Sequence, residues 1–134
     1  MDKTVKQKIE YWLKSSKHDF KTMEGLFRIK RYSDSLFFGH IVLEKILKAL
    51  VVQNIKDNAP ATHNLIVLSQ IANLKFNKKE LELLALVNRF NIRSRYPDEK
   101  LKFYKICDYK FTKNNLDNIK NFYQKLCQKL RLKK

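Results

Sequence analysis

The residues best suited to bind an anion are three arginines in one short segment. Arg89, Arg93 and Arg95 lie within seven positions, in a chain whose other cations are mostly lysine. A guanidinium group offers a planar pair of donors that suits phosphate or carboxylate, which an ammonium group does not. Such close like charges repel each other unless an anion or an acidic group lies between them. Either the segment binds a phosphate, or acidic side chains of the chain neutralise it (Asp19, Asp98 or Glu99).

A second group of polar residues lies in the segment 36–52, which is otherwise strongly apolar. His40, Glu44 and Lys48 are four positions apart, so a helix stacks them on one face. They form either a buried polar cluster at a dimer cleft, or a simple Glu–Lys pair beside a solvated histidine. A helix that is apolar nearly all round must be buried on more than one side, which predicts a homodimer.

The remaining chemistry-bearing residues do not form a recognisable catalytic or metal site. His63 adjoins the expected start of a short helix and is interpreted as structural. Two cysteines, Cys107 and Cys127, are far apart and no Cys-x-x-Cys is present, so we expect no metal and no cofactor. Only two glycines occur in the chain, which excludes most phosphate-binding glycine loops.

The elements that must position these residues are helices, because the apolar residues recur with a period near 3.6 throughout. The predicted fold is all-α, an up-and-down bundle of four long helices plus a short one, in a single domain over residues 1–134. The expected helices span about residues 4–30, 33–56, 63–73, 77–96 and 112–130. Ser33, Thr62, Asn77 and Thr112 are the expected helix starts, and Pro97 ends the fourth helix. The stretch 96–111 is expected to be a long aromatic loop that is functional or covers something.

The balance of charge favours an anionic partner. Lysine and arginine number 29 against 13 acidic residues, a formal net charge of +16, which suits nucleic acid or a nucleotide. A coding bias that spreads lysine over every solvated face would produce the same balance. No base-reading element is visible, so we expect no sequence-specific DNA binding. The charged start of the chain and the absence of a long apolar run predict a cytoplasmic protein with no membrane span.

Three motifs, in this order, resemble the HEPN (higher eukaryotes and prokaryotes nucleotide-binding) domain family over about residues 11–130. They are Phe38-Gly39-His40 with Glu44-Lys45 and Lys48-Ala49-Leu50, then Pro60 with His63 and Leu65, then Asn88-Arg89 with Ser94 and Tyr96-Pro97-Asp98. The resemblance implies a four- or five-helix bundle that usually dimerises. Many members are metal-independent RNases with an Arg-x4–6-His motif paired across the dimer. In a toxin–antitoxin branch the motif is Arg-x4-His-x-Tyr, and the partner is a small nucleotidyltransferase that can modify the tyrosine.

The family motif falls on this chain with one departure. Its arginine corresponds to Arg89 and its tyrosine to Tyr96, but Ser94 occupies the position of the histidine. A serine hydroxyl does not exchange protons near neutral pH as an imidazole does. The resemblance therefore leaves enzymatic activity open, while the missing histidine argues against it. His40 is a remote candidate for a replacement base.

Three hypotheses about function remain. In the first, the chain is a non-catalytic module that binds nucleotide or RNA phosphate and acts with a nucleotidyltransferase. In the second, it is an RNase toxin. In the third, it is a helical dimer that serves only as a protein-interaction module. The residues expected to bind phosphate are Arg89, Arg93, Arg95, Tyr96, Lys45 and Lys48.

Overall fold

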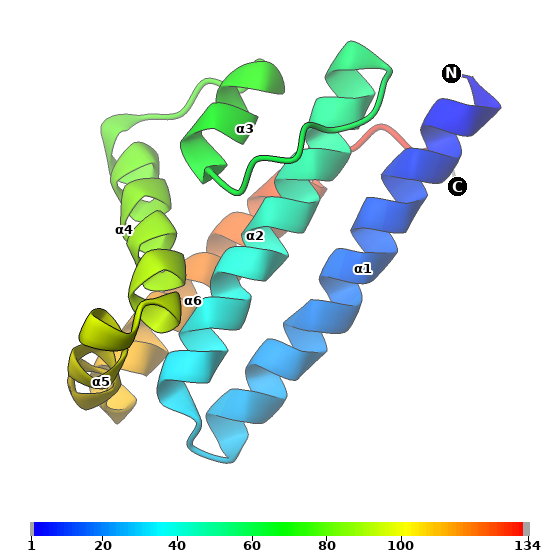
Figure 1. Cartoon of the computed structure of the whole chain (residues 1–134). Coiled ribbons are helices and arrows are strands. Elements are labelled where there is room, and N and C mark those ends of the chain that lie inside the picture. The colour runs from blue at the N-terminus through cyan, green and yellow to red at the C-terminus, as the bar shows by residue number, and fades with distance from the viewer. Residues whose placement is uncertain (1, 133–134) are drawn as a thin grey trace.

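The structure, a computed structural model, describes residues 2–132, and over these residues it contains helices and no strands. The long helices run alternately down and up the bundle, and two short helices join them (Figure 1). This confirms the predicted all-α bundle of long helices. In chain order the helices are α1 (Lys3–Arg28), α2 (Tyr32–Ile55), α3 (Leu65–Ile71), α4 (Lys78–Arg95), α5 (Pro97–Ile106) and α6 (Tyr109–Cys127).

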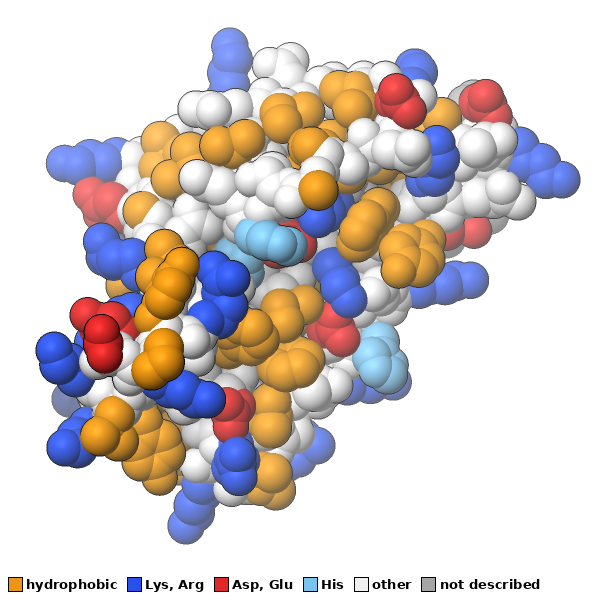
Figure 2. Space-filling model, in the orientation of Figure 1, with side chains coloured by type: hydrophobic (Ala, Val, Ile, Leu, Met, Phe, Trp, Pro, Cys, Tyr) orange, Lys and Arg blue, Asp and Glu red, His pale blue; other side chains and the backbone are white. Residues whose placement is uncertain are grey.

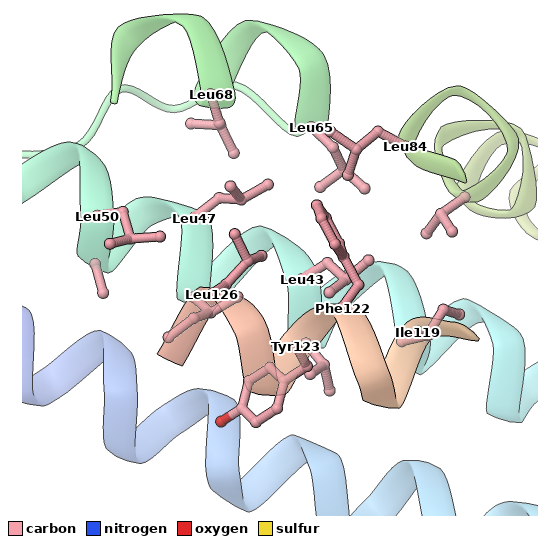
Figure 3. Packing of buried hydrophobic residues seen from close by; sticks show 14 of the residues in the cluster. Leu43, Leu47, Leu50, Leu65, Leu68, Leu84, Ile119, Phe122, Tyr123 and Leu126 are labelled. Carbon is pink, nitrogen blue, oxygen red and sulfur yellow. The ribbon is translucent and has the colours of Figure 1, made fainter. Parts of the chain in front are cut away.

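The centre of the bundle is α2, which contacts α1, α3, α4, α5 and α6. Its apolar side chains pack against leucines of α3 and α4 and against the aromatic and aliphatic residues of α6 (Figure 3). Helices of the same chain therefore cover most of the apolar surface of α2. That surface does not by itself require a second subunit, and the homodimer stays a prediction. The labelled core residues are Leu43, Leu47, Leu50, Leu65, Leu68, Leu84, Ile119, Phe122, Tyr123 and Leu126.

A glycine allows α6 to lie close to α2. A Cβ atom added to Gly39 would be 2.7 Å from Cδ1 of Ile119, which is too short for two carbon atoms. A buried hydrogen bond of 2.8 Å between the hydroxyl groups of Ser16 and Tyr123 joins α6 to α1. α6 lies behind α2, with α1 and α4 on either side of α2 (Figure 1).

The prediction of an aromatic loop over residues 96–111 is wrong in its secondary structure, because residues 97–106 form α5. Pro97 ends α4 as predicted, but it also occupies the first turn of α5, where a missing N–H costs nothing. Asp98 and Glu99 follow in the first turn and complement the helix dipole. Phe103 then packs in the core 5.5 Å from the ring of Phe90, so this segment covers the end of the bundle.

Three of the four expected helix starts also differ. The fourth helix has its N-cap at Asn77 as predicted, with a full capping box to Glu80. In contrast, α2 begins at Tyr32 with no side-chain cap, because the backbone turn before it, with Arg31 N–H bonded to the Leu26 carbonyl at 2.8 Å, sets its start. The N-caps of α3 and α6 are Asn64 and Asp108 rather than Thr62 and Thr112. Both caps accept hydrogen bonds from backbone N–H groups of the first turn.

Candidate functional site

His40, Glu44 and Lys48 of α2 form a buried polar cluster. The alternative prediction, a Glu–Lys pair beside a solvated histidine, is wrong. His40 is 1% exposed and Lys48 is 6% exposed. The carboxylate of Glu44 lies between them: Oε2 is 3.0 Å from the Lys48 ammonium group, and Oε1 is 3.8 Å from Nδ1 of His40. The ring of Trp12 on α1 covers the Lys48 ammonium group, 5.2 Å from the ring centroid. The cluster therefore lies where α1 meets α2.

His40 has partners for both ring nitrogens. Its Nε2 is 2.8 Å from the backbone carbonyl of His63, which can only accept, so Nε2 donates. Its Nδ1 then accepts from the side-chain amide of Asn91 on α4, at 3.3 Å. This pattern fits the neutral imidazole, and burial lowers the pKa of His40 against the opposing attraction of Glu44. Neither nitrogen is left for a substrate, so the geometry does not support His40 as a replacement base.

The lowered pKa of His40 predicts a loss of stability in mild acid. Below about pH 6.5 the unfolded chain takes up a proton at His40 that the folded chain resists, so the free energy of unfolding falls as the pH falls. One such proton contributes a slope of up to about 1.4 kcal/mol per pH unit. Urea unfolding between pH 7.5 and pH 5 should show this slope reduced in His40→Gln. The exposed control His18→Gln should keep it, and an unchanged slope in His40→Gln would contradict the expectation.

His63, interpreted from the sequence as structural, belongs to the same cluster. It lies in the connection between α2 and α3, and its Nδ1 is 2.9 Å from Oε1 of Glu44. Its side chain is 65% exposed, in contrast to that of His40. Sequence spacing could not identify this contact, because residues nineteen positions apart meet only after the chain has turned back over α2.

One flank of α4 holds this connection in place. Asn88 accepts a hydrogen bond from the backbone N–H of Leu65 at 3.0 Å and donates one to the side chain of Asn64 at 3.1 Å. Asn91 binds His40, and Arg95 follows four positions later on the same flank. Neither asparagine was among the site residues expected from the sequence, although Asn88 belongs to the third motif and the spacing of Asn88, Asn91 and Arg95 is that of one helix face.

Arg93 and Arg95 of α4 point in different directions. Arg93 forms an ion pair with Glu99 of α5 at 3.3 Å and lies over the ring of Phe103, 5.3 Å from the ring centroid. Arg95 is two positions further, hence about 160° away around the helix, and is exposed. Arg89 is also exposed. No ion pair joins Arg89 or Arg95 to an acidic side chain among residues 2–132.

The other expected phosphate-binding lysines also have acidic partners. Lys45 binds the carboxylate of Asp19 and donates to the hydroxyl group of Ser15 at 2.7 Å. Lys48 binds Glu44. Lys45 thus joins α2 to α1, as Arg93 joins α4 to α5, whereas the Lys48–Glu44 pair lies within α2.

The two remaining positions of the family motif differ in exposure. Ser94 is half-buried, and its hydroxyl group donates to the backbone carbonyl of Phe90 at 2.7 Å. It faces its own helix and lies about 140° around α4 from Arg89, five positions away. Tyr96 is 55% exposed at the junction of α4 and α5, and the Arg95 guanidinium group lies 5.8 Å from the centre of its ring.

The face between α1 and α4 shows these groups together. Figure 2 displays histidine near its centre, with Lys or Arg side chains on both sides and apolar side chains between them. We call the set of residues Glu44, Lys48, His63, Asn88 and Asn91, with His40 beneath, the central cluster. In residues 2–132 no group of three His, Cys, Asp or Glu side chains is placed to hold a metal ion. Among the described helices, none is long and apolar enough to cross a membrane.

Comparison with known proteins agrees with the arrangement of the helices. Residues 9–132 match the HEPN domain, which is nearly the whole chain. Neither the curated proteins nor the solved structures gave a match. The matched range begins in α1 and extends past the end of α6, so it includes every element that contributes to the central cluster. The chain therefore belongs to the HEPN domain family.

Proposed function

We propose that this chain binds the phosphate groups of a nucleotide or of RNA through the exposed side of α4. The family relates the chain to nucleotides and RNA in general terms, and the net charge of +16 favours such a partner. The observation that carries the proposal is which of the expected cationic residues have an acidic partner and which do not. Of the expected phosphate-binding residues, Arg93, Lys45 and Lys48 are bound to carboxylates, whereas Arg89 and Arg95 are exposed without an acidic partner among residues 2–132.

The spacing of these two arginines suits a strand better than a single phosphate. Six positions of helix separate Arg89 from Arg95, which corresponds to about 9 Å along the axis and about 120° around it. Two guanidinium groups that differ in both position and direction would contact different phosphates of a strand that passes around α4. Tyr96 presents an exposed ring beside Arg95, and such rings stack on bases in single-stranded nucleic acid. We therefore favour single-stranded RNA over a mononucleotide as the ligand.

The test is binding of short single-stranded RNA measured by fluorescence anisotropy over a range of salt concentrations. The double variant Arg89→Gln/Arg95→Gln is expected to bind RNA about tenfold or more weakly, because two charge-assisted hydrogen bonds to phosphate are removed. The slope of log affinity against log salt should fall by about 0.7 for each arginine replaced. The control Lys21→Gln/Arg28→Gln removes the same charge from exposed positions of α1.

Equal losses of affinity in both double variants would show that only overall charge matters, and the proposed site would be wrong. Binding that does not respond to salt would instead favour the protein-interaction module, since an apolar contact releases no counterions.

We also propose that the chain acts as a homodimer with a nucleotidyltransferase as its partner. The partner rests on the resemblance to the toxin–antitoxin branch alone, and co-purification with the product of an adjacent nucleotidyltransferase gene would test it.

The proposed homodimer is supported by Phe37 and Ile41, which are half-exposed on α2 and lie outside the packed core. Sedimentation at micromolar concentration should give a dimer, and Ile41→Lys should give a monomer.

A further inference from the structure

A hollow beside the N-terminal half of α1 is lined by aromatic and polar side chains. Its volume is about 470 Å³, within the range of roughly 300–1,000 Å³ that is usual for sites that bind small ligands. The segment that follows α2 lies beside this half of α1 (Figure 1) and contributes one of the lining residues. The lining residues are Thr4, Gln7, Lys8, Tyr11, Trp12 and Asn58. We call this hollow the Tyr11 pocket.

The polar and aromatic residues of α1 reach the pocket because they share one face of the helix. Positions 4, 7, 8 and 11 are separated by three or four residues, the spacing of neighbours on a helix surface. Thr4, Gln7 and Tyr11 are exposed, and Lys8 is half-buried. This face of α1 therefore presents a set of side chains that the packing of the bundle does not use.

Two rings form adjoining walls of the Tyr11 pocket. The ring centroids of Tyr11 and Trp12 are 5.1 Å apart, and the ring planes meet at 74°. The Tyr11 side chain is 62% exposed, whereas Trp12 is half-buried and has the Lys48 ammonium group 5.2 Å from its ring centroid. A flat molecule that stacks on the Tyr11 ring therefore lies beside a second ring that is already held in place. Such an arrangement suits a planar aromatic ligand.

The polar groups of the pocket indicate which planar ligand fits. The carboxamides of Gln7 and Asn58 form no hydrogen bond with any side chain or backbone group of residues 2–132. A carboxamide offers a donor and an acceptor side by side, which matches N7 and the N6 amino group of adenine. An apolar side chain of a protein partner would cover both carboxamides without satisfying them, which disfavours that occupant.

We propose that the Tyr11 pocket binds a nucleobase, and adenine in preference to a pyrimidine. The purine offers the larger ring for stacking, and its edge pairs with a carboxamide. Lys8 lines the same pocket and supplies a cation for the phosphate attached to the base. The pocket belongs to α1 rather than to α4, so this inference does not rest on phosphate binding by Arg89 and Arg95.

The chain carries its own reporter for this pocket, because Trp12 is its one tryptophan. The experiment titrates the full chain with adenosine and follows tryptophan fluorescence. Saturable quenching is expected, and a parallel titration of N-acetyltryptophanamide corrects for light absorbed by the nucleoside. Uridine should bind about tenfold more weakly, since it has a smaller ring and lacks the N6 and N7 pair.

Variants of the pocket separate stacking from hydrogen bonding. Tyr11→Leu keeps an apolar side chain and the Trp12 reporter but removes the exposed ring, and it should weaken adenosine binding about tenfold or more. Gln7→Ala/Asn58→Ala should reduce the preference for adenosine over uridine, because the groups that recognise the base edge are lost. Tyr104→Leu, which removes a ring that is 67% exposed on α5, is the matched control and should bind adenosine as the unmodified chain does.

The base can belong to a free nucleotide or to an RNA strand, and two further probes distinguish these sources. A short oligoadenylate that quenches Trp12 at lower concentration than AMP does, and less effectively in Arg89→Gln/Arg95→Gln, would identify an RNA strand. AMP that binds more tightly than adenosine, with the difference removed by Lys8→Gln, and as tightly as the oligoadenylate, would identify a free nucleotide.

The outcomes keep this inference apart from the proposed function. The absence of saturable quenching by adenosine and oligoadenylate would overturn the base pocket, while RNA binding that depends on Arg89 and Arg95 would still stand. Unchanged adenosine affinity in Tyr11→Leu would overturn it too. So would equal affinity for adenosine and benzyl alcohol, which would favour a protein side chain as the occupant. Adenosine binding together with RNA binding that ignores both arginines would support the pocket and overturn the site on α4.

Discussion

Replacing Glu44 with glutamine is expected to lower the free energy of unfolding by about 3 kcal/mol, one of the two largest effects predicted for this chain. The Lys48 side chain is 8% exposed and lies under Trp12, so its ammonium group would lose its counter-charge while remaining away from water. His63 would lose its carboxylate partner in the same step. Urea unfolding monitored by circular dichroism measures the change.

Two comparisons show whether burial is the cause. Glu44→Leu/Lys48→Met removes both charges and should recover most of the lost stability, because an apolar pair has no desolvation penalty. Asp117→Asn breaks the ion pair with Lys113, which is also four positions apart on a helix but about half exposed. That control should cost at most about 0.5 kcal/mol. A destabilisation as large in Asp117→Asn as in Glu44→Gln would show that burial is not the cause.

Truncating Phe90 to alanine is expected to cost about 3–5 kcal/mol, the usual range for a buried aromatic residue. Phe90 is 2% exposed and contacts Phe103 of α5 and Phe111 of α6, with ring centroids 5.5 and 6.1 Å away. The cavity would therefore open at the point where three helices meet. We expect α5 to loosen first, because Phe103 is its one buried residue.

The measurement is again denaturant unfolding, together with hydrogen exchange of the α5 amides. Ile92→Ala, two positions away and 47% exposed, is the control and should change stability by no more than about 0.5 kcal/mol. Faster exchange of α5 in Phe90→Ala but not in Ile92→Ala is the expected pattern. Protection of α5 that survives the truncation of Phe90 would show that other residues hold this helix.

A substantial part of the fold follows from the order of apolar residues. The period near 3.6 is a local property, because each helix satisfies its own backbone hydrogen bonds, and so the long helices and the cap at Asn77 could be predicted. The stacking of His40, Glu44 and Lys48 on one face is equally local. Pro97 is also a local signal, but it has two roles: it ends α4 and it begins α5. The sequence pattern predicted only the end of the first helix.

The partners of the charged residues could not be predicted, because they come from different helices. The sequence places Arg89, Arg93 and Arg95 together, yet α4 turns Arg93 towards Glu99 and Arg95 towards the opposite flank. Packing alone decides that Lys45 meets Asp19.

The sequence alone determined the all-α class, the cationic character and the family resemblance of this protein, since these depend on composition, periodicity and short motifs. Only the tertiary structure decided which histidine is buried and which is exposed. His40 and His63 are the same residue type, and their difference arises when the connection between α2 and α3 crosses α2 and its backbone covers one ring. The same crossing brings the other ring to Glu44 at the surface.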